Sequence, residues 1–173
     1  MTAALTTRLG PVNAMHDMLV RLYALPDPDE ALAACAAQGV TIRRALVPEK
    51  HAVVDWVRAR FPSALAEVEA AFARPPATCF IALRAHRLAG FACHDVTCPN
   101  FFGPEGVAAD ERGRGIGRAL LLATLHAQRA DGFAYAIIGG VGPAAFYAKA
   151  VGAVDIAGST PGIYGGMLDT PGE

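Results

Sequence analysis

The chain has 173 residues, of which 53% are hydrophobic and 18% charged, and its formal net charge is −1. This length fits one domain with its own hydrophobic core, and a near-neutral chain without a block of like charge excludes nucleic acid and an anionic membrane as expected partners. No apolar stretch is long enough to cross a bilayer, and no basic segment precedes an apolar run at the start. We therefore expect no signal peptide and a cytoplasmic location.

The N-terminal part is predicted to form an extension (1–39) that packs on the remaining domain (40–173). Residues 18–25 are rich in strand formers and are followed by Pro26. A helix is expected next, because Asp27 can cap its first turn and Gly39 supplies the left-handed residue that often ends a helix. We expect the strand of this extension to extend the sheet or to contact a second copy of the chain in a homodimer.

The rest of the chain alternates between strand and helix patterns. Apolar periodicity, together with the prolines and glycines that interrupt it, predicts a strand at 40–46, helices around 53–61 and 65–72, and strands at 79–85, 88–96 and 101–109. After these come a helix at 114–130, a strand at 133–138, a short helix at 143–151 and a closing hairpin of 154–157 with 163–168. Hairpins combined with one strand–helix–strand crossover predict a single α/β (α+β) domain, with a mixed and largely antiparallel central sheet flanked by helices.

The cysteines do not predict a disulfide framework or a metal centre. Cys35, Cys79, Cys93 and Cys98 lack the density of a secreted disulfide scaffold. Cys93, His94 and Cys98 lie close enough in the sequence to suggest a zinc site. However, structural zinc usually needs four closely spaced ligands, and no second pair of ligands follows. Buried reduced thiols are the favoured interpretation, and no metal is expected.

The most informative segment is the turn between the strand at 101–109 and the long helix. It contains three alternating glycines with three arginines, in the order Arg112, Gly113, Arg114, Gly115, Ile116, Gly117 and Arg118. Unobstructed N–H groups at a helix start, helped by the helix dipole, form an anion-binding nest. Arginines add donors suited to a pyrophosphate. The alternative is a tight turn without a ligand.

Two well-known phosphate-binding loops do not fit this turn. The dinucleotide fingerprint needs a sixth-position glycine, where this chain has Arg118, and the P-loop needs a Gly-Lys-Ser or Gly-Lys-Thr that is absent. The pattern that remains is Arg-x-x-Gly-x-Gly, supplied by Arg112, Gly115 and Gly117. It resembles the coenzyme A signature of the GNAT N-acetyltransferase superfamily.

This resemblance covers roughly residues 40–168, whose elements follow the order typical of that superfamily. It implies a single GNAT-like domain, an N-acyltransferase activity, and acetyl-CoA as the acyl donor bound by the glycine turn. It also implies that the backbone of Val107, Ala108 and Ala109 pairs with the pantetheine arm like an added strand. The strands bearing Val107 and Ile138 are expected to splay apart and admit the thioester.

A second segment, 142–149, resembles another GNAT motif, whose tyrosine commonly protonates the departing thiolate. The resemblance makes Tyr147 the general acid; the alternative is a core aromatic beside Phe146. Two departures affect the position of Tyr147. Gly142 or a neighbour stands where asparagine is common, and Val151 adds one residue before the next glycine.

Acyl transfer to an amine also needs a group that accepts the amine proton. Glu105, on the strand leading into the glycine turn, is the first candidate; its alternative is an exposed strand-end charge. His94 and Asp95 are second candidates. The pair Gly139-Gly140 is predicted either to allow close approach of a ligand or to form a bulge. Tyr164 is predicted either to line an acceptor pocket or to be a packing residue.

The acceptor is expected to be a small-molecule or peptide amine. Two other kinds of protein remain open at this point: a non-catalytic acyl-CoA-binding or regulatory module, and a nucleotide-binding protein.

Overall fold

The computed structural model describes residues 15–168, which form a seven-stranded sheet in the order β2-β3-β4-β5-β6-β1-β7. The strands are β1 (Met18–Arg21), β2 (Val40–Arg44), β3 (Cys79–Arg84), β4 (Arg87–His94), β5 (Phe101–Val107), β6 (Tyr135–Ile138) and β7 (Val154–Asp155). The helices are α1 (Asp29–Ala37), α2 (Lys50–Arg60), α3 (Leu65–Ala70), α4 (Ile116–Ala130) and α5 (Ala144–Val151). All neighbouring strands are antiparallel except β5 and β6, so the predicted mixed, largely antiparallel sheet is confirmed.

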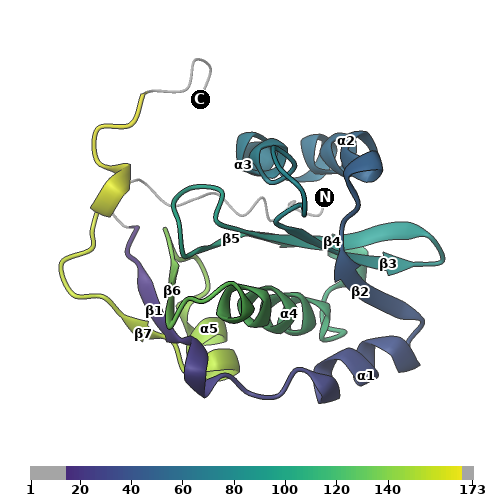
Figure 1. Cartoon of the computed structure of the whole chain (residues 1–173), viewed down its shortest axis with the longest axis horizontal. Helices are drawn as coiled ribbons and strands as arrows, with labels where there is room; N and C mark the ends of the chain where they lie inside the picture. Colours follow the sequence, from purple (N-terminus) through teal and green to yellow (C-terminus); the bar gives the residue numbers. More distant parts are fainter. Residues whose placement is uncertain (1–14, 169–173) are drawn as a thin grey trace, which may run out of the picture.

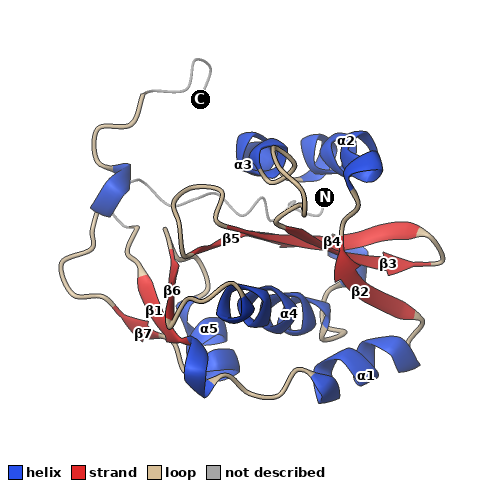
Figure 2. Ribbon diagram, in the orientation of Figure 1, coloured by secondary structure: helices blue, strands red, loops and turns tan. Residues whose placement is uncertain are grey.

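Helices cover both faces of the sheet. In Figure 1, α2 and α3 lie on one side of the β3–β5 region, whereas α4 and α5 lie on the other. Figure 2 shows the same layers by type of element. Each side has its own apolar core: Val57, Val68 and Phe91 belong to the core under α2 and α3, and Leu121 and Leu125 belong to the core around α4. The sheet is therefore buried on both faces over its centre.

The long helix α4 is held by its leucines. Leu120, Leu121, Leu122 and Leu125 are all fully buried, and burying such a side chain contributes about 1.5–3 kcal/mol. The helix begins after Gly115 and is followed by Gly132, both with positive φ. Its position fixes the glycine turn at one end and Asp131 at the other.

Strand β1 lies inside the sheet, between β6 and β7. Met18 pairs with Ile138 on one side and with Asp155 on the other. The prediction that this strand joins the sheet is confirmed. Asp27 also accepts a hydrogen bond from the Asp29 N–H at 2.8 Å, and Gly39 has a φ of +73°, as expected for the ends of α1. The division into an extension and a domain at residue 39 stays a prediction.

The predicted closing hairpin of 154–157 with 163–168 is wrong. Strand β7 pairs with β1, and residues 162–164 form a short 3-10 turn instead of a strand. Gly162 and Gly166 have positive φ, which interrupts an extended backbone. Strand β7 therefore pairs on one side with β1 and forms the edge of the sheet.

Because all four residues of β1 pair with β6, and Met18 and Leu19 also pair with β7, we expect the amides of β1 to exchange slowly with solvent. Hydrogen–deuterium exchange measured by mass spectrometry should show the peptide covering Met18–Arg21 protected to the same degree as β4. Rapid exchange in this peptide would contradict an interior position for β1.

Within residues 15–168, no helix is both long and apolar enough to cross a bilayer. Cys35, Cys79 and Cys93 are buried free thiols, as predicted, whereas Cys98 is partly exposed.

Candidate functional site

The glycine turn has the backbone conformation of an anion-binding nest. Gly113 and Gly115 have φ values of +76° and +83°, a region that side-chain-bearing residues rarely adopt. A Cβ at either position would meet no atom within 4 Å, so the backbone, rather than crowding inside the protein, requires glycine here. Gly115 caps α4 without any side-chain hydrogen bond. The first amides of α4 are therefore available to an external acceptor.

A cavity of about 260 Å³ lies directly against this turn. Its lining consists of Val107, Glu111, Arg112, Gly113, Gly115, Ile116, Gly117, Arg118 and Phe146. Seven of the ten predicted cofactor-binding residues are in this set, whereas Ala108, Ala109 and Arg114 are not. Sequence reasoning missed Glu111 and Phe146 as lining residues, although both adjoin residues it had singled out.

The three arginines of the turn differ in their partners. Arg112 Nε donates to the Val107 carbonyl at 3.2 Å. Arg114 lies 3.4 Å from Glu111, whose carboxylate also forms a 2.9 Å ion pair with Arg84 of β3. Within residues 15–168, Arg118 has no ion pair. Arg112 and Arg118 line the cavity, and Arg114 helps to anchor the turn to the sheet.

The predicted backbone contact with a pantetheine arm needs one correction, at Ala108. Its N–H donates to Ala89 of β4 at 2.8 Å, and its carbonyl accepts the Glu111 N–H at 2.9 Å. Because N–H groups alternate in direction along a strand, Val107 faces the opposite edge of β5. Ala108 is thus occupied by the protein itself. Val107 faces the other edge of β5, where its carbonyl accepts the hydrogen bond from Arg112 Nε.

That edge is free because β6 ends beside the start of β5. They pair in parallel at only two positions, Phe101 with Ile137 and Phe102 with Ile138. From Glu105 to Val107, β5 continues along β4, after an irregularity in the register, with no pairing to β6. Strand β6 ends at Ile138, so this edge of β5 has no β6 partner beyond Phe102, and the predicted splaying of the two strands stays a prediction.

The two predicted catalytic residues lie together. Tyr147 of α5 is buried, with its ring 6.2 Å from the ring of Phe102 and 5.1 Å from that of Phe146. Glu105 of β5 is close enough for the two side chains to perturb one another's pKa. Its Oε1 is buried and has no hydrogen-bond partner. A Cβ on Gly117 would lie 3.4 Å from this oxygen, which places Glu105 just behind the cavity wall.

Burial controls the protonation of this pair. It raises the pKa of Glu105 from 4.5 to about 8, while the contact with Tyr147 lowers it in part. Burial, followed by the adjacent Glu105 carboxyl, also raises the pKa of Tyr147 above its usual range. Both groups are therefore largely protonated near neutral pH. The alternative interpretation of Glu105 as an exposed strand-end charge does not hold for Oε1.

The raised pKa of Glu105 predicts a pH-dependent stability. Protonated Glu105 contributes stability that is fully present below pH 4.5 and is lost as the pH rises through about 8. Glu105→Gln removes this loss. We expect the variant to gain roughly 2–4 kcal/mol in free energy of unfolding over wild type between about pH 5 and about pH 8.5, since one pKa unit corresponds to about 1.4 kcal/mol.

Urea denaturation of both proteins at the two pH values measures this difference. Glu30→Gln, at an exposed position of α1, serves as the control and should show no comparable gain. If the free energies of unfolding of Glu105→Gln and wild type differ by the same amount at both pH values, the burial of this carboxyl group is contradicted.

The other predicted residues lie elsewhere. His94 and Asp95 are at the end of β4, and Asp95 lines a different cavity. Tyr164 packs against the glycine pair: a Cβ on Gly139 would overlap its hydroxyl, and one on Gly140 would lie 3.5 Å from its ring. Burial raises the pKa of Tyr164 to about 12. The glycine pair therefore makes room for Tyr164, and no bulge is needed to explain it.

Solved structures share this fold, although no family model and no curated protein matches the chain. A region of a fungal multi-domain beta-N-acetylglucosaminidase, described as a GCN5-related glucosamine N-acetyltransferase region, superposes with a TM-score of 0.69 at 16% identity over 82% of this chain and 20% of that one. A GCN5-related N-acetyltransferase from Sphaerobacter thermophilus gives 0.60 at 19% identity, over 82% of this chain and 48% of that one. A Drosophila protein gives 0.59 at 16% identity, over 82% of this chain and 47% of that one.

This chain spans less than half of each of these three chains, and identities at this level establish the fold alone. The glycine turn before α4, the short parallel pairing of β5 with β6, and the mixed sheet agree with the resemblance found in the sequence. The chain has the fold of the GCN5-related N-acetyltransferase (GNAT) superfamily.

Proposed function

We propose that this protein is an N-acyltransferase that moves the acetyl group of acetyl-CoA to an amine acceptor. The observation that carries the proposal is the uncapped start of α4, where Gly113 and Gly115 open a cavity beside the free edge of β5. An anion at this helix start gains unpaired amides and the positive end of the helix dipole. A chain extending from that anion along Val107 reaches the gap between β5 and β6.

In the proposed reaction, the acceptor nitrogen attacks the thioester carbonyl carbon directly, and the carbon–sulfur bond breaks. Ionised Glu105 accepts a proton from the nitrogen, and the Tyr147 hydroxyl gives its proton to the departing thiolate. Because the two side chains are neighbours, protonated Glu105 then returns a proton to Tyr147 and restores both groups. The raised pKa of Tyr147 favours this return, since the phenolate is the stronger base of the two.

This mechanism needs Glu105 ionised before each turnover. Because its pKa is about 8, the rate should rise with pH and level off above that value. We propose no covalent acyl-enzyme, because none of the four cysteines lines the cavity at the glycine turn.

The direct test is to incubate the protein with acetyl-CoA and a panel of small and peptide amines and to follow the release of free thiol. We expect release above the rate without protein for at least one amine, together with acetylated amine in equal amount by mass spectrometry. Binding of acetyl-CoA without release across the whole panel would instead identify a non-catalytic acyl-CoA-binding module. Thermal stabilisation by ATP or NAD but not by coenzyme A would identify a nucleotide-binding protein.

A further inference from the structure

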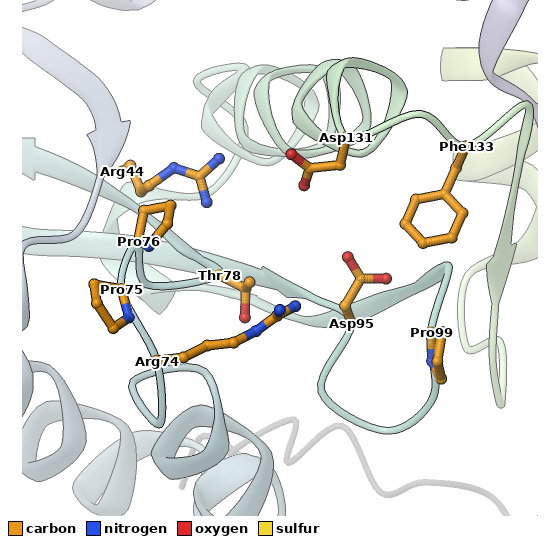
Figure 3. Close-up of a pocket in the computed structure, with 9 residues that line it drawn as sticks. All are labelled: Arg44, Arg74, Pro75, Pro76, Thr78, Asp95, Pro99, Asp131 and Phe133. Atoms are coloured by element: carbon orange, nitrogen blue, oxygen red, sulfur yellow. The ribbon is translucent and has the colours of Figure 1, made fainter.

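A second cavity, of about 420 Å³, lies at the opposite end of α4 from the glycine turn. Figure 3 shows the residues around it, which are Arg44, Arg74, Pro75, Pro76, Thr78, Asp95, Pro99, Asp131 and Phe133. They come from the end of β2, the link between α3 and β3, the turn after β4, and the turn after α4. None of them lines the first cavity. Since α4 has 15 residues, about 22 Å of helix separates its two ends.

One side of this cavity is acidic. Asp95, Asp131 and the neighbouring His94 have ligand-type atoms within 4.8 Å of one another. Burial alone would raise the pKa of Asp95, but hydrogen bonds from His94, Asn100 and Gln128 lower it overall, so this carboxylate stays ionised. Asp131 is the C-terminal cap of α4, where the helix dipole is negative and a carboxylate is unfavourable. A positive group placed between the two carboxylates would therefore be stabilised.

The other side is basic. Arg44 Nη1 donates to the Ala77 carbonyl at 2.8 Å, and its guanidinium lies 4.8 Å from the centre of the Phe80 ring. These two contacts fix the orientation of the guanidinium and leave its other nitrogens for an anion. Arg74, from the exposed link before β3, reaches the same space (Figure 3).

The four charges face one cavity without pairing with each other. Among residues 15–168, no ion pair joins Arg44 or Arg74 to Asp95 or Asp131, whereas Arg84 pairs with Glu111 elsewhere in the molecule. Two positive and two negative side chains sum to zero. A dication would therefore meet two facing guanidinium groups, and His94 Nδ1 is already hydrogen-bonded to Asp95 at 2.7 Å. Both features disfavour a divalent metal.

Apolar surface completes the lining. Phe133 and Pro99 lie beyond the two aspartates and Pro75 and Pro76 lie beside the two arginines, so apolar surface borders both charged sides and offers contacts to a hydrocarbon group (Figure 3). We propose that this cavity binds a free α-amino acid with an apolar side chain, whose carboxylate contacts Arg44 and Arg74 and whose ammonium group contacts Asp95 and Asp131. This site is separate from the acyl-transfer site, and its ligand is not the acyl acceptor.

The test is isothermal titration of the full chain, without acetyl-CoA, against the proteinogenic L-amino acids and two single-charge analogues of leucine. These analogues are 3-methylbutylamine, which lacks the carboxylate, and 4-methylpentanoate, which lacks the ammonium group. We expect saturable binding of apolar amino acids such as leucine or phenylalanine. Each single-charge analogue should bind at least about tenfold more weakly, because hydrogen bonds to charged groups contribute about 1.5–3 kcal/mol.

Two variants locate the site. Asp131→Asn changes an exposed side chain without a hydrogen-bond partner among the described residues, so it should fold normally and bind the amino acid at least about tenfold more weakly. Arg129→Gln, an exposed change in the same turn of α4 that does not line the cavity, should bind like wild type. No binding by any amino acid, equal binding of the single-charge analogues, unchanged binding by Asp131→Asn, or thermal stabilisation by Mn²⁺ alone would each overturn the proposal. Because acetyl-CoA is absent, these outcomes are independent of the acyltransferase test.

Discussion

Replacing Gly115 with aspartate is expected to abolish the binding of acetyl-CoA while the protein remains folded. The position has a φ of +83°, so any side chain there costs about 1–2 kcal/mol of stability. A Cβ would meet no protein atom, and the new carboxylate would instead project toward the cavity. There it would repel a pyrophosphate and compete for the first amides of α4. We expect affinity to fall by about 10²-fold or more, since each lost charge-assisted hydrogen bond costs about 1.5–3 kcal/mol.

Isothermal titration with acetyl-CoA measures this loss. Gly158→Asp is the matched control, because Gly158 has a φ of +74°, has equally open space around its Cβ position, and does not line the cavity. The control should show a similar loss of stability with unchanged affinity. Wild-type affinity in Gly115→Asp would remove the glycine turn from the binding site.

Replacing Tyr147 with phenylalanine is expected to reduce turnover by roughly 10²- to 10⁴-fold, the usual contribution of a positioned general acid. The phenyl ring keeps the contacts with Phe102 and Phe146, so the fold and the affinity for acetyl-CoA should persist. Only the proton donor to the thiolate and the partner of Glu105 are lost. Thiol release under saturating acetyl-CoA measures the effect on kcat.

The control for this variant is Tyr135→Phe, which removes a hydroxyl from an exposed tyrosine paired with Tyr23. Turnover of the control should match wild type. If Tyr147→Phe keeps the wild-type rate, Tyr147 is a packing residue and the proton of the thiolate comes from another source.

Local sequence signals predicted most of the elements that build the candidate site. Three alternating glycines before a leucine-rich helix specified the turn, because left-handed backbone and unpaired amides are local properties. The resemblance to GNAT proteins also brought Tyr147 and Glu105 into consideration. What the sequence left open was whether these two residues meet, because they lie on separate elements and only the packing of α5 against β5 joins them.

Long-range pairing explains the main errors. An apolar segment at 163–168 has a local strand pattern, but β7 pairs with β1, which is more than a hundred residues away in the chain, and residues 162–164 form a 3-10 turn. Local sequence patterns do not encode which segment of the chain pairs with a given strand. Ala108 was assigned to ligand binding for a similar reason, since the direction of its N–H depends on the register of β5 with β4.

The second cavity also lies beyond sequence reasoning. Arg44, Arg74, Asp95 and Asp131 are dispersed along the chain. Asp95 was considered only as a candidate base, and the other three have the pattern of solvated surface charges. They surround one space only because β2, β3, β4 and α4 all begin or end at the same edge of the fold (Figure 3).

Isothermal titration calorimetry of the wild-type protein with coenzyme A tests the acyl-CoA site most directly. Coenzyme A retains the pyrophosphate and pantetheine arm without an acyl group, so its binding depends on the nest at α4 and the free edge of β5 rather than on turnover. We expect one molecule to bind per chain, with an affinity that weakens as salt is added, because the contact is with charged phosphates. Absence of binding heat at several temperatures, with the protein shown to be folded by circular dichroism, would contradict the assignment of this turn.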